Sequence, residues 1–176
     1  MENWEEESPP RMAFFVPDVP GGWQTVTECT KYAESIGMVV LPAEIRPLVP
    51  LDTTPQLLRL KEEGADFIYS SGVQSPQAVV LRDAERLGLL DEIQFCGDEM
   101  LAGEILIEMA GAAAEGYVVY KAYPWFDEME NPGIKLIVDN MMKYHGKLKK
   151  NPEYMSVWPI AIGCEAIRRA IEELGY

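Results

Sequence analysis

Short apolar runs alternate with amphipathic segments along most of this chain. The runs are four or five residues long and rich in β-branched and aromatic side chains, which is typical of strands buried in a parallel sheet. They predict strands at Met12–Val16, Met38–Leu41, Asp66–Ser70, Glu92–Cys96 and Tyr117–Tyr120, the second of which extends toward Ile45.

The segments between these runs have helical spacing. The first places Val26, Cys29, Ala33 and Ile36 on one apolar stripe and ends at Gly37. Two later helices open at Asp52–Pro55 and Ser75–Pro76, where a capping side chain precedes a proline, and a fourth spans Ala102–Ala114. Regular alternation of strand and helix predicts an α/β fold: a three-layer sandwich with a five-stranded parallel sheet in the order 2-1-3-4-5, as in flavodoxin-like or Rossmann-like lobes.

The alternation stops at Pro124, which sets the expected domain organisation. Residues 1–10 are expected to form a flexible acidic tail, 11–123 the α/β lobe, and 124–176 a crossover loop with two helices. The last helix carries an apolar stripe that needs a surface to cover it, so we expect it to dock on the α/β lobe, to pair with another chain or to remain partly exposed. The stripe consists of Ile160, Cys164, Ile167, Ile171 and Leu174.

Composition narrows the possible functions. The formal charge of -14 disfavours nucleic acid as a partner, because an acidic chain repels the phosphate backbone. The three cysteines are far apart in sequence and are interpreted as small buried hydrophobic residues, and the single histidine has no cluster of metal ligands near it. We therefore expect no metal and no cofactor. The first ten residues, MENWEEESPP, lack the basic and apolar regions of a secretory signal, so the chain as written is expected in the cytoplasm.

Ligands of an open parallel sheet bind beyond the carboxyl ends of the strands. The residues to inspect are therefore Asp18–Trp23, Ser71–Gln74 and Gly97–Glu99. The turn around Gly21 matches no phosphate-binding pattern and is interpreted as a glycine turn entering a helix. Trp23 either walls a pocket or packs on that turn.

Asp98 and Glu99 are adjacent carboxylates at this edge. Such a pair binds an ammonium group, acts as a general base, or remains a solvated loop in which one residue caps the next helix. The sequence pattern alone leaves these alternatives open.

Several segments resemble the branched-chain amino-acid-binding proteins of ABC importers, within the type I periplasmic-binding and receptor group. They are RMAFFVPDVPGGW, the run from Leu51 to Leu89, FCGDE and AAEGYVVYKAYPW, in the order and spacing of the second lobe of that family. The resemblance covers Arg11 to Tyr176 and extends into the segment that returns to the first lobe. The signal peptide and the first lobe of the family are not part of this sequence.

The resemblance implies a clamshell of two lobes that closes on an amino acid and delivers it to a membrane permease. The acidic residue that binds the ligand's ammonium maps to Glu99, with Asp98 beside it. Further contacts map near Gly21, Val73 and Gln74. The family often has aromatic residues next to the first turn and at the position of Val73, so this chain departs from the pattern at both places.

Four functions follow from these observations. The first is one lobe of a solute-binding protein, which is not an enzyme and needs no cofactor. The others are the ligand domain of a receptor, a truncated fragment that binds nothing, and a flavodoxin-like enzyme, the last disfavoured because the acidic pair has no histidine or lysine beside it.

Overall fold

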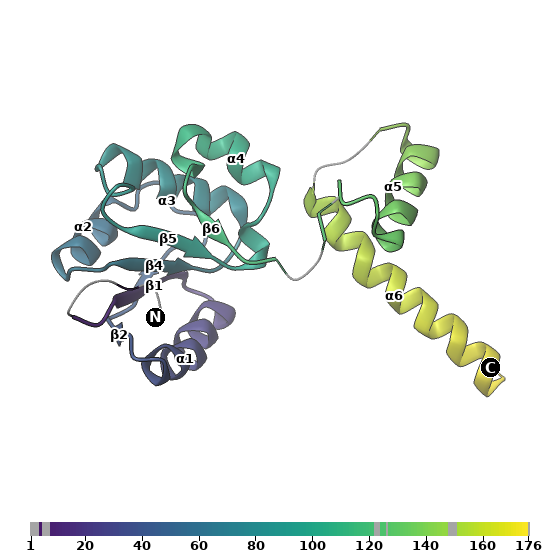
Figure 1. Ribbon diagram of the computed structural model, residues 1–176, viewed down its shortest axis with the longest axis horizontal. Coiled ribbons are helices and arrows are strands. Elements are labelled where there is room, and N and C mark those ends of the chain that lie inside the picture. Colours follow the sequence, from purple (N-terminus) through teal and green to yellow (C-terminus); the bar gives the residue numbers. More distant parts are fainter. Residues whose placement is uncertain (1–3, 5–7, 122–123, 126, 148–150, 176) are drawn as a thin grey trace. The chain divides into compact units, whose positions relative to one another are not determined.

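The structure is a computed structural model that describes residues 4, 8–121, 124–125, 127–147 and 151–175, with the side chains of 151–159 and 161 left aside. The chain divides into two compact units, Met1–Lys121 and Ala122–Tyr176. Figure 1 shows a sheet with helices in the first unit and helices in the second. Most of the expected tail, residues 1–10, lies outside the described residues. The described Trp4 lies against Phe67, with 5.7 Å between ring centroids.

The first unit is built on a parallel sheet, and the predicted α/β fold class is confirmed. The path of paired strands is β2 (Val39–Val40), β1 (Arg11–Pro17), β4 (Phe67–Ser70), β5 (Gln94–Gly97) and β6 (Val118–Val119). This path corresponds to the expected order 2-1-3-4-5. A sixth strand, β3 (Glu44–Arg46), pairs with the end of β1.

The extra strand arises because the expected second strand is interrupted. β2 pairs with Arg11 and Met12, whereas β3 pairs with Phe15 to Pro17. Pro42 stands between the two segments and has no N–H to donate to the ladder, so the strand divides there.

Both faces of the sheet carry helices, as Figure 1 shows. One face carries α1 (Pro20–Ser35), and the other carries α2 (Thr54–Glu62), α3 (Gln74–Arg86) and α4 (Glu104–Ala110). Side chains of β1 alternate between the two faces: Phe15 belongs to the main core, whereas Phe14 lies outside that cluster, and both are fully buried. The expected helix Ala102–Ala114 is shorter as α4, because Gly111 at φ 62° starts a separate 3-10 turn, Gly111–Ala114.

The expected stripe on the first helix is only partly buried, which corrects the interpretation of the cysteines. Ala33 is buried, but Cys29 is exposed and Ile36 is 42% exposed. The principal contacts of α1 are with β1 and β2, so the part of the stripe that faces away from these strands stays open. Cys164 is exposed as well, on the last helix.

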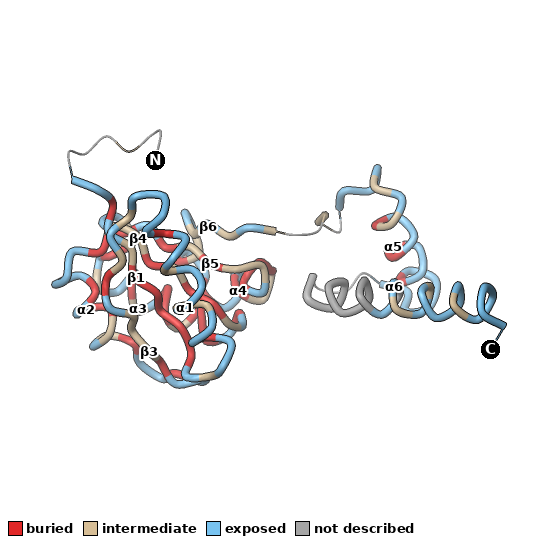
Figure 2. The backbone as a smooth tube through the Cα atoms, turned by 90° about the horizontal axis from the view of Figure 1, so that it is seen from below, coloured by how far each residue is buried: buried red, intermediate tan, exposed pale blue. Residues whose placement is uncertain are grey.

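The second unit consists of α5 (Pro132–His145) and α6 (Asn151–Leu174). The side chain of Asn131 caps α5 by accepting hydrogen bonds from Gly133 N and Ile134 N. Four apolar residues of α5 are buried together: Ile134, Ile137, Val138 and Met141. Figure 2 shows the described part of α6 as mostly exposed, and none of the described helices is long and apolar enough to cross a membrane.

The first turn of α1 contains two adjacent glycines, Gly21 and Gly22, and only Gly22 lies against the end of β1. Substitutions at the two positions therefore test whether α1 must approach β1 closely. A Cβ on Gly22 would overlap the carbonyl oxygen of Pro17, whereas a Cβ on Gly21 would meet no atom within 4 Å. We expect Gly22→Ala to lower the free energy of unfolding by about 1–3 kcal/mol, because the backbone must move to relieve the overlap. Gly21→Ala is the matched control and is expected to be neutral or to stabilise by up to about 1 kcal/mol. Urea denaturation measures both, and equal effects would contradict this account of the close approach.

Candidate functional site

Three loops meet at the carboxyl edge of the sheet. They follow β1, β4 and β5, which end at Pro17, Ser70 and Gly97. Gly72 lies at their junction: its N–H donates to Asp98 Oδ2 at 3.4 Å, and a Cβ added to it would stand 3.7 Å from the Pro17 ring. The structure therefore brings together the loops that the strand pattern indicated.

A buried arginine, Arg46, contacts the loop after β4 at this junction. Arg46, at the end of β3, is 1% exposed, and its Nη2 donates to the carbonyl oxygen of Ser71 at 3.1 Å. Desolvation by burial lowers the pKa of this guanidinium. Arg46 thus fixes the loop after β4 by a hydrogen bond to the main chain. The sequence did not indicate this role, because Arg46 lies just beyond the expected second strand.

Asp98 joins two of the loops. Its Oδ1 accepts from Met100 N at 3.1 Å, which caps the 3-10 turn Glu99–Leu101, while its Oδ2 accepts from Gly72. Burial raises the pKa of Asp98; the N–H donors of Gly72 and Met100 oppose that rise, and the neighbouring charge of Glu99 adds to it. Of the alternatives open for the acidic pair, helix capping describes Asp98.

Glu99 begins the 3-10 turn and is half-buried. Tyr120 follows the last strand, β6, and burial and the negative charge of Glu99 raise the pKa of its phenol. Sequence reasoning missed Tyr120, although it assigned the residue to the end of the last strand. The rule that singled out the other strand ends also applies to this strand and would have found it.

The remaining predicted residues have different surroundings. Trp23 donates from Nε1 to Asp18 Oδ1 at 2.9 Å, which ties the indole to the turn before α1, yet 48% of Trp23 remains exposed. Gly21 is exposed in the same turn of α1. Trp23 therefore contacts the turn and also presents a surface at this edge.

Val73 and Gln74 differ from one another. Val73 precedes α3 and is 48% exposed, so it lies at the open edge. Gln74 is buried, and its Oε1 accepts from Leu106 N at 3.1 Å, near the start of α4. The amide of Gln74 thus braces α4 from inside the lobe.

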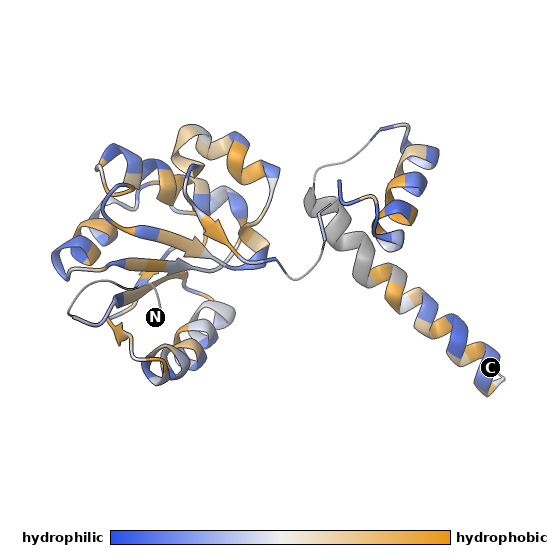
Figure 3. Cartoon of the chain, viewed as in Figure 1, coloured by the Kyte–Doolittle hydropathy of each residue, from blue (hydrophilic) through white to orange (hydrophobic). Residues whose placement is uncertain are grey.

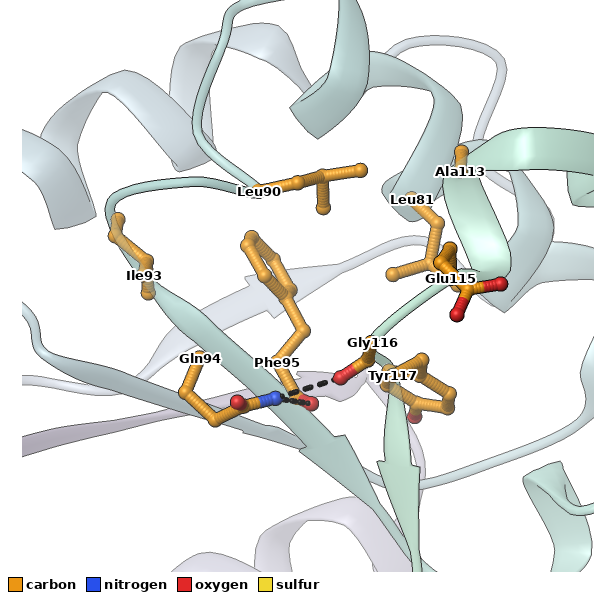
Figure 4. A pocket seen from close by; sticks show the side chains of 9 residues that line it. All are labelled: Leu81, Leu90, Ile93, Gln94, Phe95, Ala113, Glu115, Gly116 and Tyr117. Carbon is orange, nitrogen blue, oxygen red and sulfur yellow. Dashed lines mark hydrogen bonds between the residues drawn. The ribbon is translucent and has the colours of Figure 1, made fainter.

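A small hollow lies at the other end of β5. Figure 4 shows its lining, which includes Phe95, Leu90 and Tyr117, and the hydrogen bond from Gln94 to the carbonyl oxygen of Gly116. Its volume of about 80 Å³ is well below the roughly 300 Å³ at which ligand pockets begin. The residues exposed at the carboxyl edge, among them Trp23 and Val73, do not line this hollow.

Comparisons with known proteins agree on one family. The family described as periplasmic binding protein matches residues 3–174. The Leu/Ile/Val-binding protein of Escherichia coli K12 is 30% identical over 122 residues, which are 69% of this chain and 31% of that protein. The leucine-, isoleucine-, valine-, threonine- and alanine-binding protein of Pseudomonas aeruginosa is 25% identical over 149 residues, 85% of this chain and 38% of that protein.

A solved structure extends the likeness to the fold. The branched chain amino acid ABC transporter from Thermus thermophilus with bound valine matches with a TM-score of 0.85 and 29% identity, over 97% of this chain and 44% of that one. The chain therefore spans about a third of the length of the curated relatives and less than half of this structure.

The two hydrogen bonds of Asp98 lead to a prediction about stability. Asp98→Ala removes both acceptors and is expected to lower the free energy of unfolding at pH 7 by about 1–2 kcal/mol, as for other lost caps. Asp98→Asn retains an acceptor for Met100 N and is expected to lose less. Urea denaturation measures the two variants, and an equal loss in both would show that the cap contributes little.

The pH dependence of the same pair has a definite sign. The pKa of Asp98 is raised in the folded state, so its contribution to stability is present below the unfolded pKa of about 4 and is lost as the pH rises through the folded pKa. Asp98→Asn removes this loss. The difference in the free energy of unfolding between the variant and the parent chain is therefore expected to shift in favour of the variant as the pH rises from about 3.5 to 7, and a shift in favour of the parent chain would contradict the raised pKa.

Proposed function

Because this chain belongs to the periplasmic binding protein family, we propose that it supplies one lobe of a two-lobed site that binds an amino acid of the branched-chain type. The observation that carries the proposal is the half-buried carboxylate of Glu99, which lies at the open carboxyl edge beside Asp98 and Tyr120. A carboxylate in this place accepts charge-assisted hydrogen bonds from an ammonium group. The relatives are named as binding proteins and one solved relative holds valine, which supports a ligand of this class.

The open edge also suggests how the lobe works. Trp23 and Val73 are each 48% exposed, and Met100, which follows Glu99 in the sequence, is 47% exposed, so apolar surface is open at this edge. We propose that a second lobe covers this surface and excludes water when the ligand binds. Water exclusion strengthens the ammonium–carboxylate attraction, because the effective dielectric constant falls.

Two further parts of the function follow from the family. Its members are periplasmic, and we propose the same compartment for the protein to which this lobe belongs. We propose that the assembled protein delivers its ligand to the membrane permease of an ABC importer, as the names of its structural relatives suggest.

The proposed half-site predicts weak binding by the chain alone. An ion pair at an exposed edge contributes about 0–1 kcal/mol, so we expect the dissociation constant for L-leucine to be millimolar or weaker. Titration of L-leucine into the ¹⁵N-labelled chain, followed by NMR, measures it. Glu99→Gln removes this ion pair and should weaken the binding about twofold to fivefold.

The matched control is Glu62→Gln, because Glu62 is an exposed glutamate at the end of α2 and lies outside the loops of the site. It should bind L-leucine like the parent chain. Micromolar affinity of the parent chain would contradict the half-site, and unchanged binding by Glu99→Gln would remove Glu99 from the proposal.

The apolar stripe of α6 supports a second proposal, that this helix is covered by another protein surface, as a second copy or the other lobe would provide. Ile160, Ile167 and Leu174 are between 63% and 69% exposed, and Figure 3 shows apolar and charged residues alternating along the described part of the helix. An exposed stripe of this kind marks an interaction surface.

For the chain alone, we expect concentration-dependent self-association that Ile167→Asp abolishes. Ala166→Asp is the control, because it introduces the same charge one position away from the stripe. Size-exclusion chromatography with light scattering measures the mass at several concentrations. A monomer at all concentrations, with both variants unchanged, would argue against self-association through α6.

A further inference from the structure

In the first unit, four side chains at one end of the core have buried polar atoms without a hydrogen-bond partner among the described residues. Arg46, Ser70 and Gln77 are at most 1% exposed, and the hydroxyl of Tyr117 is also shielded from solvent. The atoms concerned are Arg46 Nε, Ser70 Oγ, Tyr117 Oη and both amide atoms of Gln77. A buried polar group without a partner destabilises the folded state, so these groups need an explanation.

Ser70 and Tyr117 lie on the face of the sheet that carries the main core. Ser70 ends β4, shares this face with the core residue Ile68, and is paired with Gly97 of β5. Tyr117 packs against the same core, and a Cβ added to Gly97 would overlap its hydroxyl. Since neighbouring strands are about 4.8 Å apart, the hydroxyl groups of Ser70 and Tyr117 are separated by about one such spacing. One water molecule bridges a distance of this order, whereas a direct hydrogen bond does not.

Arg46 and Gln77 reach the same end of the core. Arg46 Nη2 donates at 3.1 Å to the carbonyl oxygen of Ser71, which directly follows β4. Burial raises the pKa of Tyr117 and the positive charge of Arg46 opposes that rise, so these two side chains lie within electrostatic range of each other. Gln77 lies near the start of α3, on the helix face that also carries Leu81 into the core. It therefore faces the sheet near the carboxyl ends of the strands.

We propose that these four side chains form a buried water site between the sheet and α3. Arg46 Nε and Gln77 Nε2 donate, Gln77 Oε1 accepts, and the two hydroxyl groups can do either. This mixture of donors and acceptors suits water, which also donates and accepts. Buried waters make about three hydrogen bonds to protein groups, and the four side chains supply them. A small anion suits the set less well, because it cannot donate to Gln77 Oε1.

The water site connects the strand ends from which two loops of the candidate functional site begin. Ser70 precedes the loop that contains Gly72, and Gly97 precedes Asp98. Gly97 has no side chain, which leaves room for the Tyr117 hydroxyl beside Ser70. Bridging water thus holds β4 and β5 together just before the hydrogen bond between Gly72 and Asp98 joins their loops. The inference concerns the lobe itself and does not depend on the proposed function.

Removal of the Tyr117 hydroxyl tests the site through the sign of its effect on stability. If water bridges the hydroxyl, Tyr117→Phe loses a hydrogen bond and should lower the melting temperature by about 2–4 °C. Removal of a hydroxyl without a partner would instead raise the melting temperature or leave it unchanged, and either result would overturn the proposal. Tyr32→Phe is the matched control, because Tyr32 is 68% exposed on α1 of the same unit. It should melt like the parent chain.

NMR detects the water itself in the parent chain. Water with a long residence time should give cross-peaks to the side-chain amide of Gln77 and to Arg46 Nε–H. The side-chain amide of the exposed Gln24 is the control and should show only the brief contacts of surface water. Absence of the cross-peaks at both Gln77 and Arg46 would overturn the proposal even if Tyr117→Phe is less stable, because the hydroxyl would then bond directly to a protein group.

A crystal of the chain grown in sodium bromide distinguishes water from an anion. Water between Ser70 and Tyr117 should give electron density without an anomalous signal. An anomalous peak at that position would show that an anion occupies the site, which would contradict the proposed water.

Discussion

The hydrogen bonds that Asp98 accepts from Gly72 and Met100 hold the candidate site together. One bond joins the loop after β4 to the loop after β5, and the other starts the short turn that carries Glu99. Arg46 anchors the same junction by donating to the carbonyl oxygen of Ser71. Glu99 is therefore presented on a loop whose two neighbours are fixed, which is the arrangement that a binding residue requires.

The two adjacent carboxylates consequently have different roles. Asp98 is half-buried and saturated with main-chain donors, and burial together with the charge of Glu99 raises its pKa. The negative charge of Glu99 thus disfavours the ionised form of Asp98.

Much of the fold could be predicted from local patterns, and the failures have local causes. Alternating apolar runs and glycine stops indicated the strands, because strand formation depends on residues close in sequence, and the right-handed crossover rule limited the order of the strands. Pro42 divided a strand where the apolar pattern continued. Cys29 lies on a helical stripe but is exposed, since the pattern shows that a helix has an apolar side and does not show how much of that side the sheet covers. Asp98 and Glu99 were found as a pair, but only the positions of Gly72 and Tyr120 in space separate their roles.

The face of the sheet beside α1 becomes less covered from β1 toward β6. Along the paired row from β1 to β6, Phe14 is fully buried, Tyr69 and Cys96 are half-buried, and Val118 is 55% exposed. The side chains on this face are therefore less buried the farther their strand lies from α1, because the principal contacts of α1 are with β1 and β2. The least covered strand is also the one whose register brings Tyr120 beside Asp98. Any surface that closes over this end of the sheet would bury apolar area and, in the same movement, exclude water from the carboxylate, so the two contributions to ligand affinity would arise together.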